Sequence, residues 1–145
     1  MSFLNSFDIS ASGLTAQRQR LDIASENIAN MNTTRTASGD TYRRKIVVLR
    51  EKPASTFQSE FNSRLQQSQK GGVQVSQIIE DQRDLQPVYA PEHPDANEEG
   101  YVMMPNVDPV KETIDGMSAT RSYEANITAF NAIKLMAQKA LEIGK

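Results

Sequence analysis

The chain has 145 residues, of which 38% are hydrophobic, with one histidine and neither cysteine nor tryptophan. These counts exclude disulfides, cysteine-ligated metals, a cysteine nucleophile and a histidine-clustered metal site. A net charge of -2 argues against a general nucleic-acid-binding protein. No stretch approaches the roughly 18 apolar residues of a membrane span, and the start of the chain lacks the features of a cleavable secretory signal. We therefore expect no enzyme activity, no cofactor, no metal, no nucleic-acid partner and no membrane span.

The first predicted element is a helix from about Asn5 to about Asn30. One apolar row recurs there at every seventh position: Phe7, Leu14, Leu21 and Ile28. A second row at the same spacing, formed by Phe3, Ala24 and Met31, is interrupted by Ser10 and Gln17. Narrow apolar rows with polar flanks are typical of helices that pack on other helices.

The middle of the chain favours strands. Residues 42–49 are rich in β-branched side chains, residues 73–79 alternate after Gly71 and Gly72, and a third strand is expected around 85–89. Between the first two strands, residues 53–70 are rich in serine and glutamine and predict a polar excursion or a weak helix. The proline-punctuated stretch after Pro87 is expected to be extended.

The last predicted element is a helix of about 35 residues that begins after Asp108, with Pro109 at its first position. Its apolar residues recur at three- and four-residue steps, with an irregularity expected near Thr120 and Arg121: Val110, Ile114, Met117, Tyr123, Ile127, Phe130, Ile133, Ala137 and Leu141. The predicted fold is therefore α+β, with terminal helices paired in a coiled-coil-like layer and a small central β-rich insert. The expected divisions are 1–33, 34–105 and 106–145.

The predicted helices are long for a chain of this size. At about 1.5 Å per residue they span roughly 39 Å and 54 Å, whereas the radius of gyration of a compact chain of this length is about 15 Å. We expect them to run side by side, with the β insert projecting from the middle. Their sparse apolar rows predict that much of the apolar surface is buried against other subunits.

Three separated motifs carry a family resemblance. They lie in the N-terminal helix and its asparagine-rich exit, in the stretch from His93 to Val107, and in the C-terminal helix around Tyr123. Together they resemble the bacterial flagellar basal-body rod and hook proteins, and most closely the proximal rod proteins. The matching positions are Gly13, Leu14, Leu21, Asp22, Glu26, Asn27, Ile28, Ala29, Asn30, Asn32, Thr33, His93, Pro94, Gly100, Tyr101, Val102, Pro105, Asn106, Val107, Tyr123 and Asn126.

This resemblance implies a structural subunit that assembles helically into the rod of the basal body. The assembled rod would cross the periplasm and transmit motor torque. The implied partners are other rod subunits, further copies of the chain, the rod-base adaptor, the rod cap and the type III export gate, which passes such subunits without a cleavable signal. The side chains expected to pack the helices and the assembly are Phe7, Leu14, Leu21, Ile28, Met117, Tyr123, Ile127, Phe130 and Leu141.

Phe57 and Phe61 fit an aromatic-x-x-x-hydrophobic pattern that, by the same resemblance, is an export-gate recognition element. The pattern is short and common, and a plain hydrophobic pair one helical turn apart is the simpler explanation.

One other function is compatible with parts of the sequence, and an enzyme is not. A soluble coiled-coil adaptor or export chaperone of the flagellar type III system would show the same helical patterns. An enzyme would need an acid–base pair in a pocket, which a single histidine in a proline-rich loop does not supply. The acidic residues between Glu92 and Asp108 lack the spacing of a cation-binding loop and favour a solvated loop.

Overall fold

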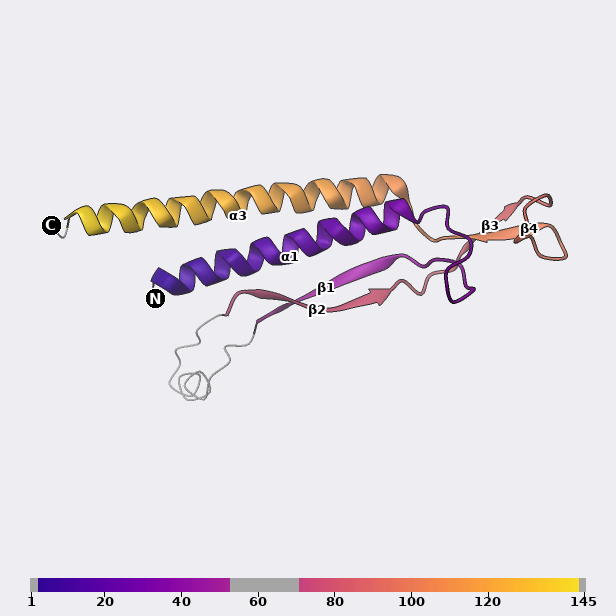
Figure 1. Cartoon of the computed structure of the whole chain (residues 1–145), viewed down its shortest axis with the longest axis horizontal. Helices are drawn as coiled ribbons and strands as arrows, with labels where there is room; N and C mark the ends of the chain where they lie inside the picture. The colour runs from indigo at the N-terminus through magenta and orange to yellow at the C-terminus, as the bar shows by residue number, and fades with distance from the viewer. Residues whose placement is uncertain (1–2, 53–70, 144–145) are drawn as a thin grey trace, which may run out of the picture. The chain divides into compact units, whose positions relative to one another are not determined.

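The computed structural model of the chain describes residues 3–52 and 71–143. Long helices lie at the two ends of the sequence, α1 over Phe3–Ala29 and α3 over Pro109–Ile143 (Figure 1). Four described strands lie between them: β1 (Lys45–Glu51), β2 (Val73–Glu80), β3 (Gln86–Tyr89) and β4 (Tyr101–Met104). The fold class is therefore α+β, as the sequence predicted.

The predicted elements are close to the observed ones. The sequence missed β4, because the segment that contains it was expected to be extended but not paired. A strand of four residues between proline-rich turns has too few positions to show a period of two. The structure shows that β4 pairs with β3. The two strands are antiparallel, with Gln86 opposite Met104 and Tyr89 opposite Tyr101.

The strands form two separate two-stranded sheets, β1 with β2 and β3 with β4. The first sheet is also antiparallel, because the amide of Lys52 donates to the carbonyl of Gly72 while the amide of Asp81 donates to that of Arg44. Each sheet has only two strands, and neither forms a large core by itself.

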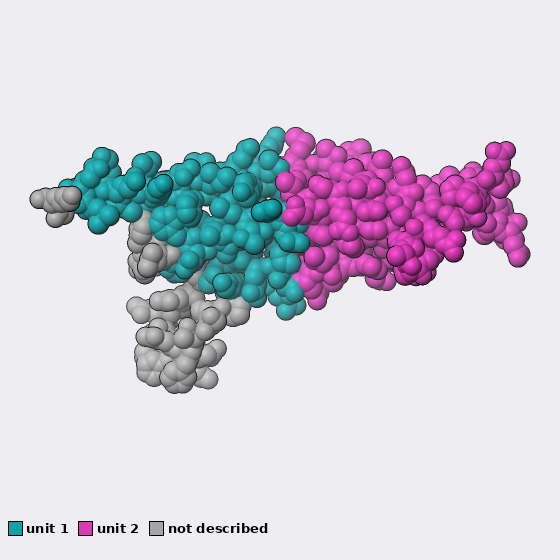
Figure 2. All heavy atoms as spheres, viewed as in Figure 1, with its two compact units in different colours: residues 1–19, 49–76, 119–145 teal, residues 20–48, 77–118 magenta. Residues whose placement is uncertain are grey.

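The chain divides into two compact units (Figure 2). Unit 1 comprises Met1–Gln19, Leu49–Ser76 and Ala119–Lys145, and unit 2 comprises Arg20–Val48 and Gln77–Ser118. Each unit contains part of both helices and part of the first sheet, so the two ends of the sequence contribute to each.

In unit 1 the two helices pack against each other in antiparallel order. The ring of Phe7 meets that of Phe130 edge to face, with centroids 4.7 Å apart. Six residues further along α1, Gly13 lies against Asn126, where an added Cβ would be 3.0 Å from the Asn126 Oδ1. A glycine at this position therefore allows the two helix backbones to approach closely.

The start of β2 is also attached to α1 within unit 1. The Ser12 Oγ accepts a hydrogen bond of 3.0 Å from the Val73 amide. Gly72, the residue before Val73, has φ +88°, and a Cβ added at Gly72 would overlap the Ser12 hydroxyl. Only glycine fits both the backbone angle and the space.

Unit 2 has a small apolar core with polar groups inside it. Buried apolar residues come from α1, the segment before β1, β4 and the approach to α3: Ile23, Ala24, Tyr42, Val102 and Val107. On the helix pair, Leu21 lies over Gly116, whose ideal Cβ position is 3.7 Å from the Leu21 Cδ1. Such a small core agrees with the low apolar content of the sequence.

The buried face of α1 is not the row that looked most apolar. Ser10 and Ala24, from the interrupted row, are buried, whereas Leu21 and Ile28, from the continuous row, are more than one-third exposed. Small side chains at the contact let neighbouring backbones come near, and the larger ones are displaced to its edge. The small residues Ser10 and Ala24 therefore lie at the closest approach, although the larger Ile23 is also buried.

The expected irregularity near Thr120 and Arg121 is wrong: α3 is one continuous α-helix through both residues. At about 100° per residue, Glu112 and Ala119 lie on one side of the helix, whereas Val110, Ile114 and Met117 lie on the other. Tyr123 and Phe130 return to the first side. The break in the apolar pattern marks a change of face and not a break in the helix.

Candidate functional site

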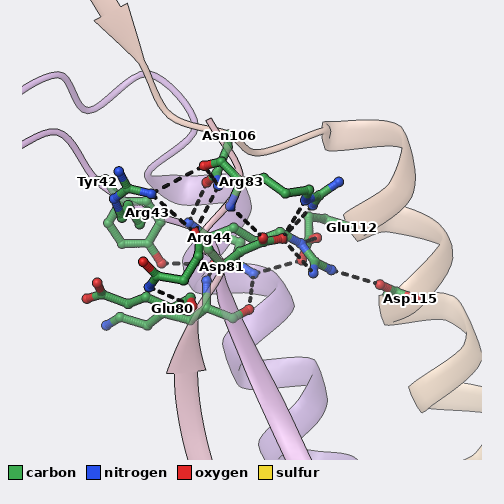
Figure 3. A network of polar contacts seen from close by, with 12 residues as sticks. Tyr42, Arg43, Arg44, Glu80, Asp81, Arg83, Asn106, Glu112 and Asp115 are labelled. Carbon is green, nitrogen blue, oxygen red and sulfur yellow. Dashed lines mark hydrogen bonds and ion pairs between the residues drawn. The ribbon is translucent and has the colours of Figure 1, made fainter. Parts of the chain in front are cut away.

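A network of polar side chains is buried in unit 2 around Arg44 and Glu112 (Figure 3). Arg44 immediately precedes β1, and Glu112 lies in the first turn of α3. The Arg44 Nε donates to the Glu112 Oε1 at 2.5 Å, and the side chains of the two residues are only 10% and 2% exposed. Arg44 also donates from Nη2 to the Asp115 Oδ2 at 3.1 Å. The guanidinium therefore joins the strand to two successive turns of α3.

Asn27 connects this ion pair to α1. Its Nδ2 donates to the Glu112 Oε2 and to the carbonyl of Lys45, each at 2.9 Å. Its Oδ1 accepts from the Tyr42 hydroxyl and from the Lys45 amide, also at 2.9 Å each. All the hydrogen-bonding capacity of one buried amide is thus used to join α1, β1 and α3.

Asn106 makes a similar connection on the other side of Arg44. Its Oδ1 accepts from the Arg44 amide at 2.9 Å, and its Nδ2 donates to the carbonyls of Asp81 and Arg83 at 3.1 Å each. The segment that leads into α3 is therefore bound to both the start of β1 and the end of β2.

Asp81 is held by two arginines. The Arg83 Nη2 lies 2.5 Å from the Asp81 Oδ2, and the Arg44 Nη1 lies 3.9 Å from the same oxygen. The hydrogen bond from Arg83 lowers the pKa of Asp81 below its ordinary value, and the carboxylate in turn raises the pKa of Arg83. Asp81 is consequently an ionised structural anchor at neutral pH.

Tyr42 is the other titratable group that the network perturbs. Burial raises the pKa of its hydroxyl to about 12, and the nearby carboxylates of Glu26, Glu112 and Glu80 act in the same direction. A neutral hydroxyl in this position donates to Asn27, so the network depends on its proton.

The chemistry of the network is structural. Glu112, Asp81 and Asp115 are all engaged with arginine, and every buried side-chain polar atom in the described part of the chain has a hydrogen-bond partner. The described residues contain no group of three or more potential metal ligands. A hollow of about 580 Å³ beside Tyr42 is lined by hydroxyl groups and by charged side chains of both signs, among them Asp40, Lys45 and Glu80.

Several motif residues have identifiable structural roles. Asn27 and Asn106 belong to the buried network, and Glu26 pairs with Lys45 at 2.5 Å. Asn30 ends α1, since its Nδ2 donates to the Glu26 carbonyl and its Oδ1 accepts from the Thr33 hydroxyl.

The remaining motif residues are distributed over the fold. Val102, Pro105 and Val107 are buried in unit 2, and the His93 Nδ1 accepts from the Asp95 amide at 3.1 Å. Gly13 and Asn126 contact each other in unit 1, Gly100 has φ +81°, and Tyr101 contacts Tyr89. The other positions are partly or fully exposed: Leu14, Leu21, Asp22, Ile28, Ala29, Asn32, Thr33, Pro94 and Tyr123.

The side chains expected to pack the assembly are only partly covered by the chain itself. Phe7, Leu14 and Phe130 are half-buried. The rest are more exposed: Leu21, Ile28, Met117, Tyr123, Ile127 and Leu141. Separately, no helix in the described part of the chain is both long and apolar enough to span a membrane. Phe57 and Phe61 lie outside the described residues.

Sequence reasoning missed Arg44 and Glu112, the centre of the network. One signal was present: alternation along 42–49 places Arg44 on the same side as Tyr42 and Ile46, a side expected to face inward. A charged residue at an inward position indicates a buried partner. No local pattern identifies that partner, because Glu112 is 68 positions away in the sequence.

Comparison with known proteins defines the class. The family model described as "Flagella basal body rod protein" matches residues 7–35, which form most of α1 and the turn after it. The model described as "Flagellar basal body rod FlgEFG protein C-terminal" matches residues 98–143, which contain β4 and α3. The two matches identify the chain as a basal-body rod protein of the bacterial flagellum, built from the paired terminal segments described above.

Full-length relatives narrow the class to one family. The chain is 54% identical to "Flagellar basal-body rod protein FlgC" of Bacillus subtilis and 42% identical to that of Escherichia coli O6:H1, with 100% of each chain covered. It is 38% identical to the FlgC protein of Borreliella burgdorferi, over 99% of this chain and 98% of the relative. The chain belongs to the FlgC family of flagellar basal-body rod proteins, and it is a structural rod subunit, not an enzyme.

Proposed function

We propose that the chain builds the rod by burying the outer face of α3 against neighbouring subunits in a helical assembly. The observation that carries this proposal is the row formed by Val110, Ile114 and Met117, which are 67%, 61% and 53% exposed. They lie on the side of α3 opposite Glu112 and Gly116, which face α1, so the described part of the chain leaves them uncovered.

An exposed row of three large apolar side chains at helical spacing is the kind of surface that a partner helix covers. The same helix is fixed in position by the Arg44–Glu112 network, so the row is presented on a rigid element. A preorganised surface loses little conformational entropy on association, which favours assembly.

The test replaces Ile114 with aspartate in cells that carry no other copy of the chain. Because Ile114 is largely exposed, we expect the variant to fold and to be exported, but to assemble no rod and to support no swimming. A buried carboxylate without a partner is strongly unfavourable, and the same defect recurs in every subunit. Export is measured by secretion, assembly by isolation of basal bodies and function by motility in soft agar.

The matched control is Thr113→Asp, which adds the same charge in the same helical turn but about 100° around the helix from Ile114. It should assemble rods and support swimming. Normal rods and normal swimming in the Ile114→Asp strain would overturn the proposal.

Family membership supports the remaining parts of the proposal. These are transmission of motor torque across the periplasm, contacts with the rod-base adaptor and the rod cap, and passage through the type III export gate without a cleavable signal. Phe57 and Phe61 remain candidates for gate recognition, and replacing both with alanine should abolish secretion. We also retain the division into a helix at 1–33, a β-rich part at 34–105 and a helix at 106–145, with the terminal helices forming the inner layer of the rod.

A further inference from the structure

The β3–β4 sheet has one face that is exposed and almost entirely apolar. Side chains two positions apart on a strand share a face, so the cross-strand pairs Pro87–Met103 and Tyr89–Tyr101 lie together. All four residues are exposed, with Tyr89 at 66% and Met103 at 47%. The opposite face contains the cross-strand pair Val88–Val102, of which Val102 is buried and Val88 is 46% exposed. The face of Pro87, Tyr89, Tyr101 and Met103 is therefore largely uncovered by the described residues.

The aromatic pair on this face is held in a fixed arrangement. The rings of Tyr89 and Tyr101 meet edge to face, with centroids 5.4 Å apart. The Tyr89 ring also lies across Gly100, where a Cβ would be 3.0 Å from the Tyr89 Cε2. A rigid aromatic surface contributes contact area while losing little conformational entropy on binding.

The connecting loop is equally constrained. The Asn97 Oδ1 accepts from the amides of Glu99 and Tyr101 at 3.1 Å and 2.8 Å. The Asp95 carboxylate accepts from the Thr34 hydroxyl at 2.8 Å. The charged side chains of this loop are therefore carried on an ordered backbone beside the aromatic pair.

The β3–β4 hairpin and its connecting loop are negatively charged. Residues 86–104 contain four acidic side chains and neither lysine nor arginine. Asp95 has Arg35 nearby at 3.9 Å. Glu92, Glu98 and Glu99 are exposed and form no ion pair with any basic residue in the described segments. A partner that covers the face must therefore bring apolar side chains for the aromatic pair and positive charges for the loop.

The C-terminal end of α3 has this complementary chemistry. Leu135, Met136 and Leu141 are all at least 60% exposed. Lys134 and Lys139 lie among them, and Lys139 is paired with Glu142 at 2.6 Å on the exposed surface of the helix. Lysine side chains pack well on tyrosine rings, and methionine and leucine pack on their edges and faces.

We propose that the face formed by Pro87, Tyr89, Tyr101 and Met103, with the adjacent Glu92, Glu98 and Glu99, docks the apolar, lysine-bearing C-terminal end of α3 of a second copy of this chain. The inference rests on the proposed function, since it presupposes assembly with rod subunits. It goes beyond that function by assigning a specific contact to the β hairpin, in addition to the outer face of α3.

The test places a photo-crosslinking benzoylphenylalanine at Tyr89, and in a second strain at Met103, with the wild-type chain co-expressed so that rods form. Basal bodies are isolated after irradiation, and the crosslinked peptides are identified by mass spectrometry. The expected product joins the probe to the C-terminal end of α3 of another copy of this chain, and crosslinks that join it only to a different rod protein would overturn the inference. Crosslinks confined to other segments, or no crosslinks from assembled rods, would overturn the inference.

Charge reversal supplies the second measurement. Glu98→Lys with Glu99→Lys should lower the yield of that crosslink at least tenfold. The control pair, Asp22→Lys with Asp84→Lys, makes the same change in charge at exposed positions outside the hairpin and should leave the yield unchanged. Equal yields in both double variants contradict the role of the acidic loop. Because these rods are assembled, a negative result here leaves the proposed function intact, whereas failure of that function appears as normal swimming of the Ile114→Asp strain.

Discussion

Arg44 and Glu112 form a buried ion pair in unit 2, whose apolar core is small. The desolvation cost of such a pair is large, and it is offset only because Asn27, Asp115 and Asp81 satisfy the remaining hydrogen-bonding groups. A satisfied network of this kind gives directional contacts between three elements. An apolar contact would hold the elements together without fixing their register so closely.

Replacing Glu112 with alanine leaves the Arg44 charge buried with part of its pairing lost. We expect the free energy of unfolding to fall by about 3–5 kcal/mol, measured by urea unfolding followed by far-ultraviolet circular dichroism. The exposed Glu124→Ala control should change it by less than about 0.5 kcal/mol. The double variant Arg44→Met, Glu112→Leu should recover most of the loss, because neither charge is then left unpaired. A loss as large in the double variant as in the single one would show that the pair itself is strongly stabilising.

Tyr42 gives the network a measurable dependence on high pH. Below the pKa of an unfolded tyrosine, about 10, the hydroxyl is protonated in both states and the stability is unaffected. Between this value and the folded pKa of about 12, the unfolded chain loses the proton more readily, so stability falls as pH rises. The chain has four tyrosines and no tryptophan, so tyrosinate absorbance reports their titration directly. One of the four should titrate near the higher value, and Tyr42→Phe should remove that step. Four ordinary titrations in the folded wild-type chain would contradict the assignment.

At the scale of the elements, the two long helices contact each other through small residues. Gly13 faces Asn126 in unit 1, and Gly116 faces Leu21 in unit 2. The space available for a Cβ differs between the two glycines, so alanine substitutions at the two positions can be compared directly. A Cβ at Gly116 would be 3.7 Å from the Leu21 Cδ1, an ordinary contact, whereas a Cβ at Gly13 would be 3.0 Å from the Asn126 Oδ1.

Alanine at each position should therefore have different effects. Gly116→Ala should raise the free energy of unfolding by up to about 1 kcal/mol, because alanine is the better helix former and the space is available. Gly13→Ala has the same gain in helix propensity but displaces the Asn126 amide, which also donates to the Ser122 carbonyl at 2.8 Å. We expect no net gain there. Equal stabilisation of both variants in thermal unfolding would show that the contact at Gly13 is not tight.

For the molecule as a whole, the distribution of charge follows the two units. Among the described residues, unit 1 carries six basic and four acidic side chains, whereas unit 2 carries seven basic and thirteen acidic ones. The chain has a net charge of only -2, yet the described part of unit 1 is positive and that of unit 2 is negative. Both units also expose apolar side chains. The positive surface of one subunit can therefore contact the negative surface of the next, and such contacts between unlike surfaces are what a helical assembly requires.

The two terminal helices, three of the four described strands and the family of the chain can all be predicted from the sequence alone. They follow from local periodicity, from capping residues such as Asp108 and from motifs that are contiguous in the chain. The counts of cysteine, tryptophan and histidine narrow the possible chemistry in the same way, because they remove most of the side chains on which nucleophile and metal sites depend.

The covered apolar rows and the buried charges, by contrast, depend on how the elements pack. The row through Ser10 and Ala24 is buried because helices approach most closely where side chains are small, a property of the pair and not of either helix. Arg44 and Glu112 are joined across 68 positions of sequence by the packing of β1 against the first turn of α3. The outer row of Val110, Ile114 and Met117 is exposed for the same reason: the direction in which Glu112 must point to reach Arg44 turns the opposite side of α3 away from its own chain.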